Sequence, residues 1–238
     1  SNTMILMKNI RIFLSQLLAL SALASCNLDQ FPDDAIDTTH AMESVSDCEN
    51  FRTGLYAGMK YCFTGIYVYA PELQTDLYHA VLNFGNFQGA FYSYSVLANE
   101  GACNNAWFGL YNYIANANFL IEGTRKLLDR GTLSEADAAL VRRYYGEACY
   151  IRAHMYYLLV QFFCEDYEPA TAGDVYGVPV VTVYAPTPDA SKYPSRGSLA
   201  KTYAQIVADL TEAETYVTAP GQPNSIFVTA DVVAALQA

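Results

Sequence analysis

The chain has 238 residues, with 13 Lys and Arg against 24 Asp and Glu, which gives a formal net charge of −11 at pH 7. This length is enough for one domain with a sizeable hydrophobic core. The acidic balance argues against nucleic acid as a partner, because affinity for nucleic acid depends on Lys and Arg that neutralise phosphates. The Walker, GxGxxG, GxSxG and HExxH motifs are all absent, so the sequence supports neither an enzyme nor a cofactor.

The first 25 residues have the layout of a secretory signal peptide. Lys8 and Arg11 precede an apolar run over 12–23, which is shorter than the about 20 residues that a bilayer-spanning helix needs. The order Leu-Ala-Ser-Cys at 23–26 resembles a bacterial lipobox, in which the cysteine is diacylated. We therefore predict a signal peptide over 1–25, a lipidated Cys26 and an extended tether over 26–45. The alternative is an ordinary core helix that carries a cysteine.

Residues 46–238 show the apolar periodicity of amphipathic helices. A first helix is signalled by Asp47, with Phe51, Leu55 and Met59 on one face. Longer helices are predicted over about 105–131, 134–162 and 199–217, and a last one begins near Thr229. Successive antiparallel helix pairs favour an all-α, tetratricopeptide-like fold with long irregular loops over 61–104 and 165–197.

The last helix has no C-terminal signal before residue 238. We therefore expect 46–238 to be the N-terminal helical domain of a longer protein. Five cysteines follow Cys26, with neither a CxxC pair nor a zinc-like spacing. This pattern favours free, buried thiols over disulfides.

The irregular segment 61–104 holds many aromatic, Gly and Asn residues, and long loops of this kind often carry function. Aromatic rings cover the apolar faces of sugars, while amide side chains form hydrogen bonds with the hydroxyl groups. The candidate ligand-binding residues are Tyr78, Asn83, Phe84, Asn86, Phe87 and Tyr92. The alternative is that these rings pack the loop onto the helices. The three histidines show no metal-ligand spacing, so no metal site is expected.

Six motifs occur along the chain: CNLDQFP at 26–32, WFGLYNYIANANFLI at 107–121, GEACYIRAHMYYLLVQFF at 146–163, YGVPVV at 176–181, Arg196 followed by YAQIVADLTEA at 203–213, and TADVVAALQA at 229–238. In this order and spacing they resemble the motifs of the SusD/RagB family of outer-membrane nutrient-binding lipoproteins from Bacteroidota. The motif residues to which we assign a structural role are Trp107, Tyr111, Asn118, Glu147, Arg152, Tyr156, Arg196 and Asp209.

The resemblance implies a surface lipoprotein, anchored in the outer-membrane lipid through acylated Cys26, that binds an oligosaccharide or a peptide. It also implies a partner, a SusC-like TonB-dependent β-barrel transporter that the lipoprotein caps. Starch-binding members place a Trp shortly after an acid equivalent to Asp76, whereas Ala-Val-Leu stands at 80–82 here. Starch is therefore a poor candidate for the ligand.

Two other functions stay open at this point. A lipoprotein glycoside hydrolase would need two carboxylates about 5–10 Å apart across a cleft. Glu147 and Arg152 are expected instead to pair with neighbouring helices or to cap backbone groups. A protein-binding scaffold without a small ligand would bury the loop aromatics, whereas a glycan-binding face would expose Tyr78, Phe84 and Phe87.

Overall fold

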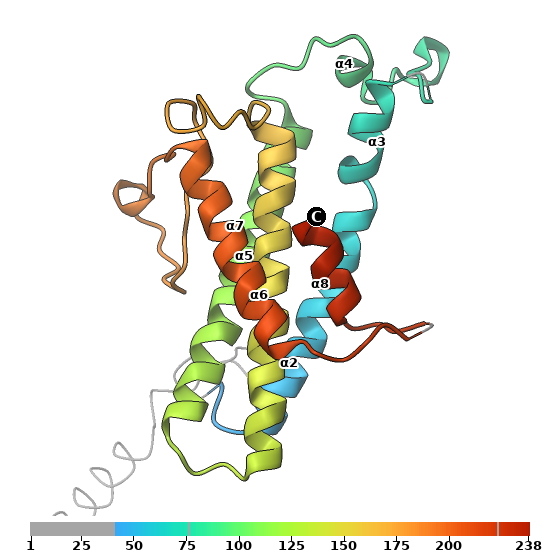
Figure 1. Cartoon of the computed structure of the whole chain (residues 1–238). Helices are drawn as coiled ribbons and strands as arrows, with labels where there is room; N and C mark the ends of the chain where they lie inside the picture. Colours follow the sequence, from blue (N-terminus) through green and yellow to red (C-terminus); the bar gives the residue numbers. More distant parts are fainter. Residues whose placement is uncertain (1–40, 76, 223) are drawn as a thin grey trace, which may run out of the picture. The chain divides into compact units, whose positions relative to one another are not determined.

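Three long helices form the centre of the computed structural model, which describes residues 41–75, 77–222 and 224–238. They are α5 (Gly101–Asp129), α6 (Glu135–Phe163) and α7 (Leu199–Tyr216), and α6 lies between the other two (Figure 1). Their apolar positions recur every three or four residues, so each helix has a continuous stripe to bury. In α6 this stripe includes Ala148, Ile151, Met155 and Leu159, all fully buried.

Shorter helices complete the packing. α2 (Val45–Met59) packs against α5 and α6, and α8 (Ala230–Gln237) packs against α7. Ser44 and Asp47 form a capping box at the start of α2, in which each side chain bonds the backbone N–H of the other residue. Ser134 and Ser198 are the N-cap residues of α6 and α7. Each serine side chain accepts a hydrogen bond from the backbone amide three residues later.

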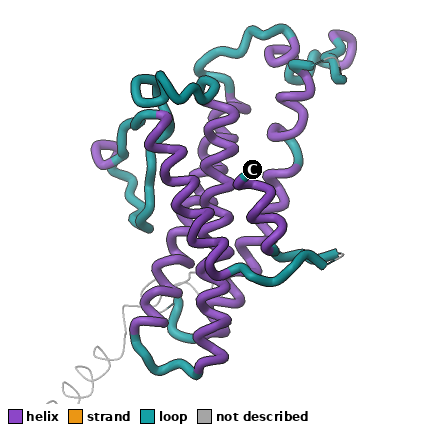
Figure 2. Tube along the Cα trace, in the orientation of Figure 1, coloured by secondary structure: helices purple, strands orange, loops and turns teal. Residues whose placement is uncertain are grey.

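The remaining elements are one or two turns long. They are η1 (Lys60–Phe63), α3 (Ile66–Leu73), η2 (Leu82–Phe84), α4 (Gly89–Tyr92) and η3 (Ala190–Lys192). The irregular segments 77–100 and 164–198 extend from the same end of the bundle, on opposite sides of it (Figures 1 and 2).

The predicted all-α fold of antiparallel helix pairs with long loops is confirmed, and the described residues contain no β-strand. Some details differ from the prediction. The helix predicted from 105 begins at Gly101. The buried face of α2 passes through Arg52, whereas Phe51 is only half-buried.

The predicted signal peptide over 1–25, the lipidated Cys26 and most of the tether over 26–45 lie outside the described residues. Only the end of that tether is described, and Val45 already belongs to α2. Among the helices that the structure describes, none combines the length and the apolar character required to cross a bilayer. The five cysteines of these residues are free, as predicted, and Cys48, Cys62 and Cys149 are buried.

Candidate ligand-binding surface

A buried cluster of charges holds α2 against α6, with Glu147 at its centre. Arg52 of α2 donates from Nη2 to Oε1 of Glu147 at 2.8 Å and from Nε to Oε2. Arg143, one turn earlier in α6, donates from Nε to Oε1 at 2.8 Å. The Glu147 side chain is 0% exposed, so these bonds replace its hydration completely.

Aromatic rings surround the other faces of Arg52. Its guanidinium carbon lies 3.7 Å from the ring centroid of Phe227, 4.9 Å from Tyr144 and 5.5 Å from Tyr56. The hydroxyl of Tyr56 accepts a hydrogen bond of 3.1 Å from the amide of Val228. Arg52 and Tyr56 therefore attach the segment before α8 to α2, and cation–π contacts contribute to that attachment.

The sequence analysis did not identify Arg52 as part of this cluster. The available signal was its register, because Arg52 is four residues after Cys48 and three before Leu55, both of which are buried. An arginine in that register predicts a buried acidic partner. It does not indicate which of the acids is the partner.

A second buried pair connects α6 with α7. Arg152 donates to Asp209 through Nε at 2.8 Å and through Nη2 at 2.5 Å. Its Nη1 donates to Oδ1 of Asn118 at 2.7 Å, so all three long helices meet at this guanidinium. Burial alone would lower the pKa of Arg152, but the hydrogen bonds that it donates to the Asp209 carboxylate, and the negative charge of that group, outweigh burial and raise the pKa.

Several motif residues hold the irregular segment 177–183 against the helices. The amide of Asn118 donates to the carbonyls of Val181 and Val183, at 3.0 and 3.3 Å. The hydroxyl of Tyr156 bonds both the amide and the carbonyl of Val181, at 2.6 and 2.8 Å. Buried backbone groups of a loop need such partners because no ladder satisfies them.

Tyr111 and Arg196 also form hydrogen bonds with the segment 177–183. The hydroxyl of Tyr111 donates to the carbonyl of Pro179 at 2.7 Å. Arg196 donates from Nε to the carbonyl of Gly177 at 2.6 Å and from Nη2 to that of Phe163 at 2.7 Å. Trp107 is half-buried and lies 5.0 Å from the rings of both Tyr111 and Phe163. All eight motif residues thus make contacts within the bundle and with its loops.

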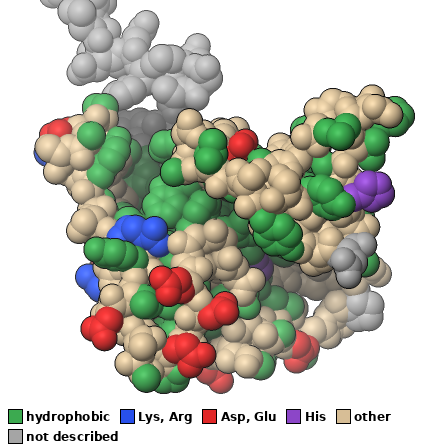
Figure 3. Space-filling view, turned by 90° about the horizontal axis from the view of Figure 1, so that it is seen from above, with side chains coloured by type: hydrophobic (Ala, Val, Ile, Leu, Met, Phe, Trp, Pro, Cys, Tyr) green, Lys and Arg blue, Asp and Glu red, His purple; other side chains and the backbone are tan. Residues whose placement is uncertain are grey.

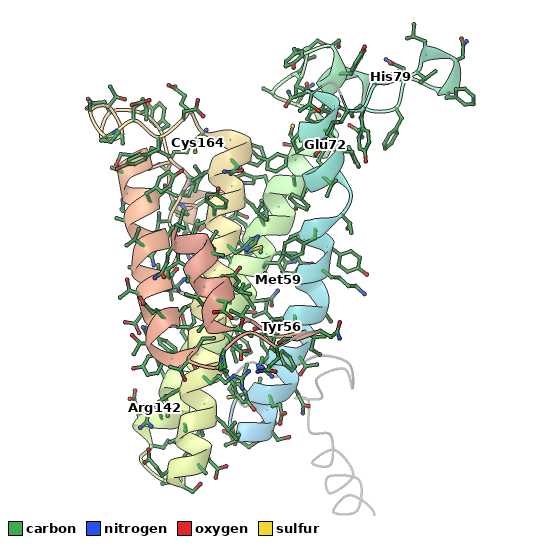
Figure 4. The ribbon with its side chains drawn as sticks, turned by 45° about the vertical axis from the view of Figure 1, so that its right-hand side comes forward. Tyr56, Met59, Glu72, His79, Arg142 and Cys164 are labelled. Carbon is green, nitrogen blue, oxygen red and sulfur yellow. The ribbon has the colours of Figure 1, made fainter. Side chains whose placement is uncertain are left out.

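The other irregular segment displays aromatic side chains. Tyr78, Phe84, Phe87 and Tyr92 are 51, 85, 67 and 46% exposed, and Asn83 and Asn86 are exposed as well. Figure 3 shows hydrophobic side chains gathered over this end of the bundle, and Figure 4 shows rings projecting around the loop that carries His79. An exposed apolar patch with polar neighbours is typical of a binding surface. We refer to residues 77–94 as the aromatic loop.

Buried contacts hold the base of the aromatic loop. Phe91 is buried in a small cluster with Ala70 and Leu73 of α3. The ring of Phe87 lies 5.7 Å from Tyr69, and the hydroxyl of Tyr94 donates to the carbonyl of Gln74. These contacts hold the loop in place while its outer rings stay exposed.

The backbone of this loop adopts left-handed conformations that side chains rarely take. Asn86, Gln88 and Tyr94 have φ of +48°, +57° and +53°. Asn accepts this region readily, whereas Gln and Tyr pay a conformational cost, and strain of this kind is often found in ligand-binding segments. The side chain of Asn86 lies directly over Gly89, so part of its role is to shape the turn.

Burial shifts the pKa values of several side chains among the described residues. Burial lowers the pKa of His154 to about 4 and raises that of Cys149 to about 12, so both are neutral at pH 7. Within the described ranges, no three His, Cys, Asp or Glu side chains are grouped so as to bind a metal ion. Glu147 and Asp209, the acidic residues that are buried as a whole in the described part of the chain, are already bonded to arginines.

Comparison with solved structures shows that other proteins share this fold. A SusD superfamily protein of Bacteroides thetaiotaomicron matches with a TM-score of 0.66 and 21% identity, over 82% of this chain and 41% of that one. A putative sugar-binding protein of Bacteroides vulgatus matches at 0.64 and 18% identity, over 82% and 42%. A laminarin-binding SusD-like protein matches at 0.62 and 17% identity, over 82% and 39%.

This chain therefore spans less than half the length of the solved structures that it matches. A search of curated proteins found no match. The SusD-like family model described as "Starch-binding associating with outer membrane" matches residues 28–236. That match covers most of the sequence and agrees with the order of motifs and with the helical fold, so the chain belongs to the SusD-like family.

Proposed function

We propose that this protein binds an oligosaccharide without catalysis, and that the aromatic loop forms part of the binding surface. The observation that carries the proposal is the exposure of Tyr78, Phe84 and Phe87 on a loop whose base is fixed. Flat rings stack on the C–H faces of sugar rings, and the amides of Asn83 and Gln88 supply donors and acceptors for hydroxyl groups. The family description and the sugar-binding relatives support a glycan over a peptide.

The exposure of these rings also bears on the two other candidate functions. A protein-binding scaffold was expected to bury the three rings, so their exposure favours a ligand-binding face. A glycoside hydrolase needs two carboxylates facing a substrate. Glu147 and Asp209 are instead sequestered by arginines inside the bundle.

We further propose that the protein is a cell-surface lipoprotein that delivers its glycan to a TonB-dependent, SusC-like transporter. The support is the lipobox-like order at 23–26 and the association with the outer membrane in the family description. Two acyl chains are enough for a durable anchor, and a diacylated Cys26 would carry them.

A panel of polysaccharides tests glycan binding. The full chain is run in native gels containing each polysaccharide, and any retardation is followed by calorimetry. The Phe84→Ala/Phe87→Ala double variant should bind at least about tenfold more weakly, because each stacked ring contributes on the order of 1 kcal/mol. Its thermal stability should change only slightly, because both rings are largely exposed and the buried Phe91 still holds the base of the loop.

The matched control is Tyr176→Ala. Tyr176 is 72% exposed, like the two phenylalanines, but belongs to the other irregular segment. Its loss should leave the affinity unchanged. Equal weakening by both variants, or none by the double variant, would exclude the aromatic loop as the binding surface.

Recovery of partners from outer membranes tests delivery. The full reading frame, tagged at its C-terminus, is purified in mild detergent, and co-purifying proteins are identified by mass spectrometry. A stoichiometric large β-barrel transporter is expected with the wild type, and Cys26→Ser should release the protein from the membrane. Recovery of the lipidated protein alone would contradict the delivery role without affecting glycan binding.

A further inference from the structure

The positive charges of this chain are distributed unevenly along the sequence. From Tyr61 to Thr124, a stretch of 64 residues, there is no Lys or Arg, although the whole chain has 13. The aromatic loop lies within this stretch. Proteins that bind carboxylate or sulfate groups do so mainly with Arg and Lys, because these side chains supply charge-assisted hydrogen bonds. The candidate surface provides neither residue from its own segment.

The arginines elsewhere in the described residues already have partners. Arg52 and Arg143 bind Glu147, Arg152 binds Asp209, and Arg196 binds two backbone carbonyls. The others are also paired: Arg125 with Tyr145, Arg130 with the carbonyl of Glu43, and Arg142 with Glu135. Arg142 lies at the end of the bundle opposite the aromatic loop (Figure 4).

The formally charged residues of the same stretch, 61–124, are all acidic. Glu72 lies in the last turn of α3, below the loop (Figure 4), and Glu100 is the N-cap residue of α5. Oε2 of Glu72 is buried and has no hydrogen-bond partner among the described residues. Its backbone carbonyl accepts the amide of Tyr78, so this carboxylate belongs to the base of the loop. An anionic ligand at this loop would face negative charge, and the stretch 61–124 supplies no Lys or Arg to offset it.

From this distribution we infer that the aromatic loop selects uncharged glycans and discriminates against uronate-containing or sulfated ones. The inference rests on the proposed function, because it specifies the charge class of the ligand for the same surface. Rings and amides recognise C–H faces and hydroxyl groups, which neutral and acidic sugars share. Acidic sugars also carry anionic groups that need Lys or Arg as partners, and the stretch 61–124 contains neither residue.

Matched polysaccharide pairs test the selection. Each neutral polysaccharide of the panel is compared with its own carboxymethylated or sulfated derivative, using the full chain and calorimetry at low ionic strength. At least one neutral polysaccharide should bind, and its anionic derivative should bind at least about tenfold more weakly. For the neutral ligand, shortening the Debye length from about 30 to about 3 Å with salt should leave the affinity unchanged.

A charge-insertion variant separates electrostatics from the bulk of the added groups. Leu82 is exposed and adjoins Phe84 in the loop, so Leu82→Arg places a cation on this surface. The tenfold difference in affinity between the neutral polysaccharide and its anionic derivative should become smaller in Leu82→Arg. It should persist in the uncharged control Leu82→Gln. A gap that is equal in the two variants would overturn the inference.

The remaining outcomes distinguish this inference from the proposal on which it depends. Anionic derivatives that bind the wild type as tightly as their neutral parents would overturn the charge selection and leave glycan binding in place. Failure of every member of the panel to bind would overturn the proposed function, and the inference with it.

Discussion

Among single residues, Glu147 makes the connection on which the packing of α2 depends. Two arginines from two helices share its carboxylate, and one of them, Arg52, is itself buried among aromatic rings. A buried ion pair adds little stability compared with apolar packing, but the removal of one partner leaves an uncompensated charge in the interior. Substitution of Glu147 is therefore expected to reduce the stability of the protein by more than the ion pair contributes to it.

Glu147→Gln should destabilise the protein by about 3–5 kcal/mol, because it leaves the buried Arg52 without a counter-charge. Urea unfolding followed by circular dichroism measures the change. The matched control is Glu135→Gln, since the Glu135 side chain is 91% exposed in its pair with Arg142. That variant should change the stability by less than about 0.5 kcal/mol. Similar values for both variants would contradict a buried, essential carboxylate.

His154 predicts a pH dependence of stability. Burial lowers its pKa to about 4, against 6.5 for the free side chain, and its neighbours are the hydroxyl of Tyr150 and the ring of Phe63. The unfolded chain therefore takes up a proton between pH 6.5 and 4 that the folded protein does not. Stability falls as the pH decreases through this range.

Between pH 7 and pH 5 this group should contribute a loss of about 2 kcal/mol. The variant His154→Phe keeps a ring against Phe63 and cannot be protonated. Unfolding free energies at the two pH values should therefore differ less for the variant than for the wild type. Equal pH dependence in both proteins would show that His154 is not held in its neutral form.

At the scale of helices, the contact between α6 and α7 depends on the absence of a side chain at one position. A Cβ atom at Gly146 would lie 2.9 Å from Cβ of Tyr216 and 3.2 Å from Cγ2 of Val217. The first distance is shorter than real contacts of this kind, and the atom concerned is close to the backbone, so it has little room to move.

Gly146→Ala should therefore destabilise the protein by about 1–2 kcal/mol, because the overpacking cost exceeds the gain in helix propensity of about 1 kcal/mol. Gly54 provides the matched control, since it lies inside α2 with no atom near the position of an added Cβ. Gly54→Ala should stabilise the protein by about 0.5–1 kcal/mol. Thermal unfolding of both variants gives the comparison, and a stabilised Gly146→Ala would contradict the close helix contact.

The helices themselves could be predicted from sequence because their apolar residues recur at fixed spacing. The buried face of α7 includes Leu199, Ile206, Leu210 and Ala213, which recur at the three- and four-residue spacing expected of an amphipathic helix. The contacts between elements could not be predicted in this way. Asn118 bonds backbone groups 63 and 65 residues away, and Arg52 bonds an acid 95 residues away. Such pairings depend on the packing of the complete domain.

The aromatic loop illustrates the same limit. Its composition indicated rings and amides, but no periodicity determined which rings would be exposed. Phe91 is buried and holds the loop to α3, whereas Phe84 and Phe87 are exposed. Asn86, which the sequence predicts to contact a ligand, adopts a left-handed conformation, and its side chain lies over Gly89, which gives it a structural role in the turn.

For the molecule as a whole, the two ends of the bundle differ. The end with the aromatic loop and the segment 164–198 carries the long irregular segments, whereas α5 and α6 meet at the other end through a short turn (Figures 1 and 2). Irregular segments on a rigid helical support are a common arrangement for ligand binding. The buried networks around Glu147 and Arg152 supply that rigidity.

Hydrogen exchange in the presence of ligand tests most directly whether the aromatic loop binds the glycan. Amide exchange is measured by mass spectrometry on the full chain, alone and with an oligosaccharide derived from a polysaccharide that binds in the panel. The account predicts added protection at 77–94, with exchange in 165–197 and in α7 unchanged. Protection confined to those other segments, with 77–94 exchanging as in the free protein, would contradict it.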